Sequence, residues 1–358
     1  MSMPDTAITR ALGLRLPIIQ APMAGGATTP ELVAAVSNAG GLGAFAAAIL
    51  APEAIRAGVA RIRALTPRPF CVNLFVLQTP RPDTAILERA QRLLAPMRAE
   101  LGLPPAAPLT RYCEDPMDQF EALLEAAPAL ASFAFDVHAP AQIERLHARG
   151  CKVAGSATNV AEARAWEAAG ADFVCAQGGE AGGHRGTFIG ACEDSLIGAM
   201  ALVPQVVDAV RVPVIAAGGI MDGRGIAAAL MLGAGAVQMG TAFLDCHESG
   251  IHPAWKQAIR EAGDTATMVT SAFSGRMARG VNNGFMRRMA AHQHELPPYP
   301  VQNALTGEIR AAAARANRPE YMSMWAGQGI AMARNLPAAE LMMKLEAEWL
   351  AAMRFGAA

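Results

Sequence analysis

The sequence predicts an α/β fold, a (β/α)8 TIM barrel with an inserted segment after its eighth strand, and three observations support this prediction. Eight short apolar runs recur along the 358 residues. Each run is almost continuously apolar rather than alternating, which is typical of parallel strands covered on both faces. Stretches with helix-capping residues separate the runs. Eight strand–helix units of this kind are characteristic of the barrel.

The predicted strands end in loops that are rich in small residues. With 53% hydrophobic and only 17% charged residues, the chain has enough apolar material to cover such strands on both sides. The eight predicted ranges are 17–23, 41–48, 70–76, 131–137, 151–158, 171–178, 212–220 and 236–243.

The helices between these strands have recognisable ends. Thr29 followed by Pro30 predicts a capped helix start with proline in the first turn, and Asn159 with Glu162 fits a capping box. Glycines then stand where each helical pattern stops and the next strand begins, a position that favours a left-handed backbone. These glycines are Gly40, Gly150, Gly170 and Gly233.

Two stretches are longer than a barrel crossover requires. Residues 78–128, which are rich in proline, form an insertion after the third strand. Residues 246–319 follow the eighth strand, where an excursion would cover the mouth of the barrel as a lid. We therefore expect a barrel domain made of residues 1–245 and 320–358 and a substrate-binding lid domain made of 246–319. The helical pattern from Pro319 to Phe355 is expected to close the ring of helices.

Composition favours a small-molecule enzyme of the cytoplasm. Lysine and arginine number 30 against 31 aspartates and glutamates, so no strong field favours nucleic acid or an anionic membrane. The six cysteines lack metal-ligand spacing, and no metal is expected. We find no secretory signal pattern and no apolar run long enough to span a membrane. A monomer or a homodimer is compatible with these features.

The motif AQGGEAGGHRG, Ala176 to Gly186, is the most informative stretch of the chain. Four glycines follow the sixth strand directly, and glycine lets a ligand approach the backbone closely. They place one imidazole, His184, on a loop that we expect to be flexible. Because active sites of barrels lie at the carboxyl ends of the strands, His184 is the first candidate for catalysis.

The loops after the seventh and eighth strands predict a phosphate site. These loops, AAGGI and QMGTAF, contain Gly218, Gly219, Gly240 and Thr241. In barrels the same two loops commonly bind phosphate through backbone N–H groups.

Two amides point to the rest of a cofactor. Asn73 lies within a buried strand and Gln177 ends another, and a buried amide without partners costs about 1–3 kcal/mol. We expect both to bond a ligand with mixed donors and acceptors along its edge, such as a flavin ring. Since no adenine-binding unit is evident, FMN fits better than FAD.

Together, QAPMAGG (residues 20–26), AQGGEAGGHRG, AAGGI and QMGTAF resemble the nitronate monooxygenases, formerly 2-nitropropane dioxygenases. The resemblance covers nearly the whole chain, and the later motifs TSAFSGRMARG, PPYP and WAGQG are most similar to class I members. It implies an FMN-dependent TIM-barrel flavoprotein with His184 as catalytic acid or base. The cofactor-binding residues expected are Pro22, Met23, Asn73, Gln177, Gly182, Gly183, Gly218, Gly219, Gln238, Met239, Gly240 and Thr241.

On the substrate side the chain departs from the family. Members often have a His, a Tyr and a Lys where this chain has Ala134, Asn303 and Gly307. FMN binding is not affected by these departures, but the preferred nitro compound is not implied. The substrate-side candidates are His138, Tyr299 and Asn303.

The resemblance implies oxidation of an alkyl nitronate, such as propionate 3-nitronate, or of a nitroalkane, by O2 to a carbonyl compound and nitrite. With a near-neutral pKa, His184 would remove the α-proton or, when protonated, hold the anion. Two alternatives stay open. One is an NAD(P)H-dependent quinone or enoyl-thioester reductase of the same flavin barrel superfamily, and the other is a non-catalytic flavin-binding protein.

Overall fold

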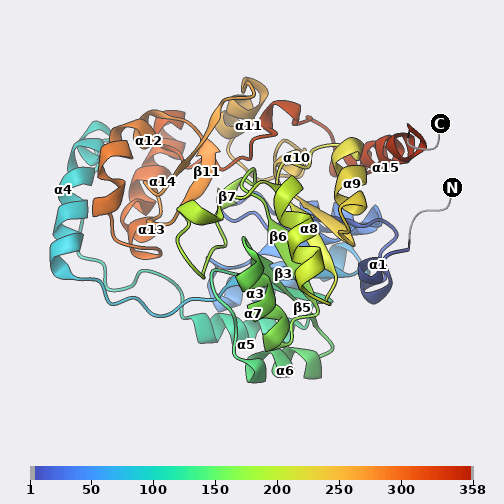
Figure 1. Ribbon diagram of the computed structural model, residues 1–358. Coiled ribbons are helices and arrows are strands. Elements are labelled where there is room, and N and C mark those ends of the chain that lie inside the picture. Colours follow the sequence, from blue (N-terminus) through green and yellow to red (C-terminus); the bar gives the residue numbers. More distant parts are fainter. Residues whose placement is uncertain (1–4, 356–358) are drawn as a thin grey trace.

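The protein is described by a computed structural model that covers residues 5–355, and its centre is a barrel of eight parallel strands (Figure 1). Neighbours in the sheet follow the order β1-β9-β8-β6-β5-β4-β3-β2, and a bridge between Ile19 and Leu42 joins the first strand to the last. The predicted (β/α)8 fold is therefore confirmed. The strands are β1 (Ile18–Gln20), β2 (Gly43–Ala46), β3 (Phe70–Phe75), β4 (Leu130–Ala134), β5 (Lys152–Ala157), β6 (Phe173–Gln177), β8 (Val214–Ala217) and β9 (Ala236–Met239).

All eight strands lie within or next to their predicted ranges, but most of those ranges extend too far toward the carboxyl end. The apolar sequence continues beyond the last ladder bond into loops that line a cavity, so apolarity alone does not mark the strand end. The clearest case is the range 236–243, because its last residues form a helix, α10 (Thr241–Leu244).

Helices surround the barrel, and the last one closes the ring as predicted. It packs against α9 on one side and α2 on the other. The helical pattern expected from Pro319 onward is nevertheless wrong before residue 338, because residues 319–337 form only short 3-10 turns and loops. The surrounding helices are α2 (Pro30–Asn38), α3 (Pro52–Leu65), α5 (Pro116–Ala126), α6 (Pro140–Ala148), α7 (Val160–Ala169), α8 (Ala199–Ala209), α9 (Gly223–Met231) and α15 (Ala338–Phe355).

The helix ends follow the predicted chemistry with one exception. The Thr29 side chain caps α2, and the four glycines expected to be left-handed have φ between 78° and 98°. Asn159 caps α7 by accepting from the Glu162 N–H group. The Glu162 carboxylate does not return this bond, so the capping box is only half formed. The Glu162 side chain is fully buried, and its carboxylate instead accepts from the N–H groups of Thr158, Phe188 and Ile189. These bonds tie α7 to the loop after His184.

A second body of structure covers one end of the barrel (Figure 1). Its own apolar cluster includes Trp255, Phe273, Phe285 and Ile309. The helix α4, from the insertion after β3, packs into the same cluster against α13, although some 200 residues separate them. The elements are α4 (Thr84–Glu100), α11 (Pro253–Arg260), α12 (Gly284–Met289), α13 (Val301–Leu305), α14 (Gly307–Arg315), β10 (Thr267–Thr270) and β11 (Ala278–Val281).

The smaller elements complete the description. The N-terminal helix packs Ile8 and Leu12 into the interior cluster of the barrel together with Ile19, Cys71 and Cys175. The ends of the predicted barrel domain, residues 1–4 and 356–358, lie outside the described residues. These elements are α1 (Ala7–Leu12), β7 (Gly183–His184), η1 (Glu193–Ser195), η2 (Ala290–Glu295), η3 (Pro319–Tyr321) and η4 (Ile330–Met332).

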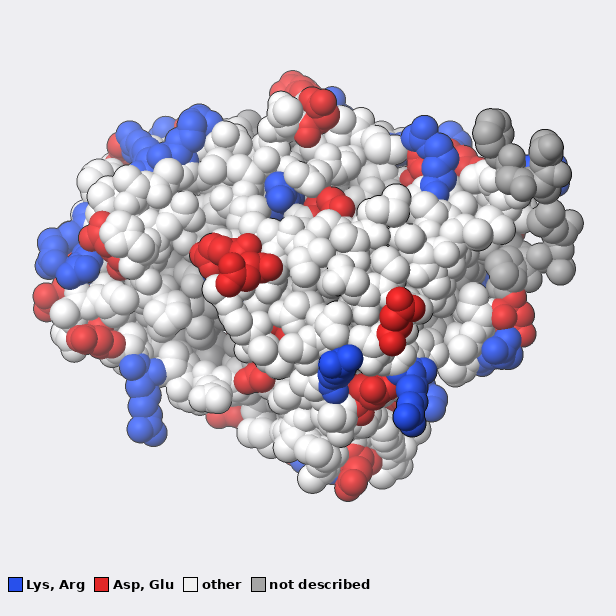
Figure 2. Space-filling view, viewed as in Figure 1, with Lys and Arg blue, Asp and Glu red and all other residues white. Residues whose placement is uncertain are grey.

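The surface carries charges of both signs. Positive and negative side chains are interspersed on the face drawn in Figure 2, in agreement with the formal net charge of −1. Within residues 5–355, each helix is either too short or too polar to cross a bilayer.

Candidate active site

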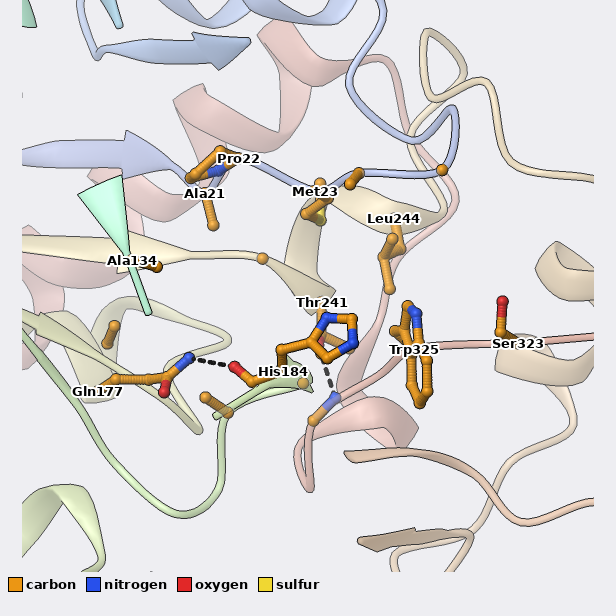
Figure 3. A pocket seen from close by; sticks show the side chains of 18 of the residues that line it. Ala21, Pro22, Met23, Ala134, Gln177, His184, Thr241, Leu244, Ser323 and Trp325 are labelled. Carbon is orange, nitrogen blue, oxygen red and sulfur yellow. Dashed lines mark hydrogen bonds between the residues drawn. The ribbon is translucent and has the colours of Figure 1, made fainter. Parts of the chain in front are cut away.

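A cavity of about 400 Å³ opens at the carboxyl ends of the barrel strands, between the barrel and the second body (Figure 3). Almost all candidates predicted from the sequence line it. His138 is the exception. The predicted residues in the wall are Pro22, Met23, Asn73, Gln177, Gly182, Gly183, His184, Gly218, Gly219, Gln238, Met239, Gly240, Thr241, Tyr299 and Asn303.

His184 is held on both sides rather than placed on a flexible loop. It belongs to β7, which pairs with β11 so that His184 lies opposite Ala278. Its carbonyl accepts a hydrogen bond of 3.0 Å from the Gln177 side chain (Figure 3). The other end of the Gln177 amide accepts from the Gly186 N–H group at 2.9 Å. The expectation of a flexible loop is therefore wrong, because β11, which lies in the segment after the eighth barrel strand, pairs with the residues around His184.

The His184 ring has one nitrogen occupied by the protein. Its Nε2 lies 2.8 Å from Ser274 Oγ, and this hydroxyl donates to the Arg276 carbonyl at 3.0 Å. Because the hydroxyl proton is used in that bond, Ser274 accepts from a protonated Nε2. The tautomer assigned in this way leaves the lone pair on Nδ1.

The environment keeps His184 neutral. Burial lowers the pKa of His184 to about 3, and the positive charges of Arg276 and Arg310 act in the same direction. The near-neutral pKa expected from the sequence is therefore wrong for this cavity.

Aromatic rings form the wall beside His184. Phe75 stacks on Phe135 with 4.1 Å between ring centroids, and Tyr299 lies 5.3 Å from Phe135 and 5.5 Å from His184. Trp325, which lies between η3 and η4, has its ring centroid 5.4 Å from that of His184 (Figure 3). Burial raises the pKa of Tyr299, so its hydroxyl stays protonated. The aromatic part of the wall is thus uncharged around one imidazole.

Phe135 adopts an unusual backbone conformation, with φ of 85°. Positive φ is rare for a bulky residue and is commonly associated with functional sites. The Arg276 guanidinium lies 4.0 Å from the centroid of its ring and donates to the carbonyls of Arg185 and Thr187. This stacking fixes Phe135 in the cavity wall.

The loops after β8 and β9, which also line the cavity, offer free donors. Gly218 and Gly219 have φ of 111° and 71°, which turns this loop sharply after β8. Among the described residues, the N–H groups of Gly219 and Gly240 have no acceptor. Thr241 Oγ1 accepts from the Gly327 N–H group at 2.9 Å, so its own proton remains available (Figure 3). This set of donors suits an anion such as a phosphate.

The two predicted amides differ in what they leave free. Asn73 donates to the Ser132 carbonyl and hydroxyl at 3.1 and 3.0 Å, while its side-chain carbonyl oxygen, Oδ1, accepts nothing within the described chain. Gln177 bonds to protein through both its amide nitrogen and its oxygen. Asn73 therefore retains an acceptor for a ligand, whereas Gln177 mainly orients the loop of His184.

His138 lies away from the cavity. Its ring packs edge-on against Phe133 at 4.5 Å and near Phe120 at 5.1 Å, and Nδ1 lies 3.1 Å from Gln142 Oε1. Burial lowers the pKa of His138. The neighbouring residues that do reach the cavity are Ala134, at the end of β4, and Phe135.

Sequence reasoning missed several residues of the site. Ser274 and Trp325 belong to motifs that were noticed, but nothing local indicates that they meet His184. Phe135 was read as one more residue of an apolar strand. Arg310 was missed because an arginine within a polar helix gives no signal of its orientation.

Comparisons with known proteins agree with this geometry. The profile of the family described as Nitronate monooxygenase matches residues 8–348. A probable nitronate monooxygenase of Staphylococcus haemolyticus is 43% identical over 344 residues, with 94% of this chain and 95% of that protein covered. One from Staphylococcus aureus is 41% identical over 343 residues, with the same shares covered.

Two solved structures are also similar. The nitroalkane oxidase of Streptomyces ansochromogenes is 42% identical with a TM-score of 0.90, and the match covers 98% of this chain and 99% of that one. FabK from Thermotoga maritima is 30% identical with a TM-score of 0.77, and 98% of each chain is covered. By fold, site and sequence, the chain belongs to the nitronate monooxygenase family and is a flavin-dependent oxidoreductase.

Proposed function

We propose that the protein is an FMN-dependent nitronate monooxygenase that oxidises alkyl nitronates with O2 to a carbonyl compound and nitrite. The observation that carries this proposal is a neutral imidazole among aromatic rings, in the same cavity as a set of free backbone donors. We further propose that residues 246–319 act as the lid over this cavity.

The residues present fit FMN. The N–H groups of Gly219 and Gly240 and the hydroxyl of Thr241 would hold the phosphate. The free side-chain carbonyl of Asn73 would accept a hydrogen bond from the edge of the flavin ring. Met23 would pack against the ring, and the Gln238 side chain, which also lines the cavity, would add a polar contact. The chemistry supplied by bound FMN is acceptance of an electron from the nitronate and its transfer to O2.

The state of His184 supports nitronates rather than neutral nitroalkanes as substrates. A base whose pKa is about 3 removes a carbon-bound proton poorly at neutral pH. A nitronate has already lost that proton, so it needs positioning and exclusion of water. For a neutral nitroalkane, in contrast, the lone pair on Nδ1 would have to take up the α-proton before oxidation. A bound anion would also raise the pKa of His184 by offsetting the nearby guanidinium charges.

We also propose that the protein works in the cytoplasm as a monomer or homodimer. All six cysteines are free, which suits a reducing compartment. Neither the location nor the oligomeric state enters the arguments about the cavity.

Oxygen uptake tests the function directly. The FMN-loaded protein is mixed with propionate 3-nitronate, ethylnitronate and the corresponding neutral nitroalkanes, with and without NADH. We expect O2 consumption and nitrite release with nitronates alone. Bleaching of the flavin by NADH without a response to any nitronate would instead support the NAD(P)H-dependent reductase, and bound FMN without either reaction would support a binding protein.

A further inference from the structure

Arg310 contributes a charged side chain to the wall of the cavity without a charged partner. It lies on α14 and donates through Nη2 to the carbonyl and side-chain oxygens of Asn303, at 2.6 and 3.0 Å. Its Nε is buried and has no hydrogen-bond partner. No carboxylate among the described residues lies within 4 Å of its guanidinium, in contrast to Arg98 with Glu308 and Arg260 with Asp245.

The rest of the cavity wall does not neutralise this charge. Its described residues include no aspartate or glutamate, and Arg310 is its one lysine or arginine. Burial lowers the pKa of Arg310 to about 10, so the guanidinium remains charged at neutral pH. A buried charge without a counterion is costly, and an anionic ligand would remove that cost.

Arg310 and the donors expected for a phosphate come from different parts of the chain. Gly219 and Gly240 follow β8 and β9 of the barrel, whereas Arg310 comes from the covering segment. Its charge instead acts on His184, whose pKa it lowers, and on Tyr299. Both of these residues belong to the aromatic wall. Arg310 therefore lies with Tyr299 and Asn303, the two substrate-side candidates that line the cavity.

We propose that Arg310 binds a planar anion with two oxygens on the substrate and thereby sets substrate specificity. This proposal rests on the proposed function for the identity of the substrate. The guanidinium fork matches such a group with two parallel hydrogen bonds, and both a nitronate and a carboxylate have this shape. The experiment distinguishes which of the two supplies it.

Arg310→Gln removes the charge, and Arg310→Lys keeps the charge but not the fork. Arg315→Gln is the matched control, because Arg315 is exposed near the end of the same helix. KM and kcat are measured with propionate 3-nitronate, which carries a carboxylate, and with propyl 1-nitronate, which does not. FMN content and circular dichroism establish that each variant is folded.

We expect Arg310→Gln to raise KM for at least one nitronate about 10- to 100-fold, with Arg310→Lys in between and Arg315→Gln unchanged. A loss confined to propionate 3-nitronate assigns the carboxylate, and an equal loss with both nitronates assigns the nitronate group. If KM for both changes less than about threefold in Arg310→Gln, the proposal is overturned.

A binding measurement keeps the test independent of turnover. The FMN-loaded protein is titrated by calorimetry with succinate, an unreactive dianion close in shape to propionate 3-nitronate. We expect succinate to bind wild type and Arg315→Gln at least 10-fold more tightly than Arg310→Gln. Equal affinities overturn the proposal for Arg310 even if nitronates are oxidised, and the expected difference supports it even if they are not.

Discussion

The Nε2 of His184 lies 2.8 Å from the Oγ of Ser274, although 90 residues separate them in the chain. Ser274 follows β10 and precedes β11, and β11 pairs directly with the strand of His184. The hydroxyl accepts from Nε2 because its own proton bonds to the Arg276 carbonyl. The segment that covers the barrel thus holds the imidazole and selects its tautomer.

Ser274→Ala is expected to lower kcat with nitronates about 5- to 50-fold with little change in KM. The physical reason is that Nε2–H loses its acceptor, so the ring reorients or carries an unpaired polar group that costs about 1–3 kcal/mol. Steady-state oxygen uptake measures the effect. Ser274→Thr keeps the hydroxyl and is the control. Wild-type kcat in the alanine variant would mean that this bond has no part in turnover.

The stability of the protein is expected to fall as the pH drops from about 6.5 toward 3, in part because of His184. The pKa of His184 is lowered to about 3 in the fold, against about 6.5 in the unfolded chain, so only the unfolded chain binds the proton in this window. Stability from this source is complete above pH 6.5, and its loss amounts to at most about 5 kcal/mol.

Urea unfolding of wild type and His184→Asn at pH 7 and pH 5, at equal FMN content, measures the contribution of His184 to the pH dependence of the free energy of unfolding. We expect the asparagine variant to lose less stability between the two pH values, because it has no imidazole to protonate. Identical pH dependence in both proteins would show that His184 does not titrate as described.

The sequence was sufficient to predict the barrel and most of the cavity wall. The strands are recognisable because their apolar runs are local, and the glycines after them are recognisable because a sharp turn needs a specific residue type. The pairing of His184 with Ala278 was not predictable in this way. A strand of two residues carries no periodic pattern, and its partner lies far away in the chain.

The charge in the cavity could not be inferred for a similar reason. Arg310 lies on a helix whose sequence, GEIRAAAAR, resembles an ordinary exposed helix. Only the packing of α14 over the barrel turns this arginine inward while Arg315 stays exposed. The low pKa of His184 depends on that packing as well, so a near-neutral value was the default from the sequence.

Gly155→Ala is expected to destabilise the protein by more than about 3 kcal/mol. A Cβ at this position in β5 would lie 1.9 Å from the indole of Trp166, which is fully buried and cannot move away. Gly263→Ala is the control, because no atom lies within 4 Å of a Cβ there. Chemical unfolding of both variants measures the difference, and similar midpoints would contradict this account of the packing between α7 and β5.

The last prediction concerns the loop after β8. Gly219 has φ of 71°, and a Cβ added there would lie 3.3 Å from Glu180 Cβ, so Gly219→Ala strains the backbone by about 1–3 kcal/mol. If its free N–H group binds the FMN phosphate, turning that group away should weaken FMN binding about 10-fold or more.

Fluorescence titration of the flavin-free protein with FMN and with riboflavin separates this effect from general damage. Because riboflavin lacks the phosphate, its affinity should change much less than that of FMN in Gly219→Ala. Gly150→Ala provides a matched control, since Gly150 also has positive φ, at 78°, but does not line the cavity. A parallel loss of both flavins in Gly219→Ala would place the phosphate elsewhere, because the strain alone acts on the whole cavity and not on one group of the ligand.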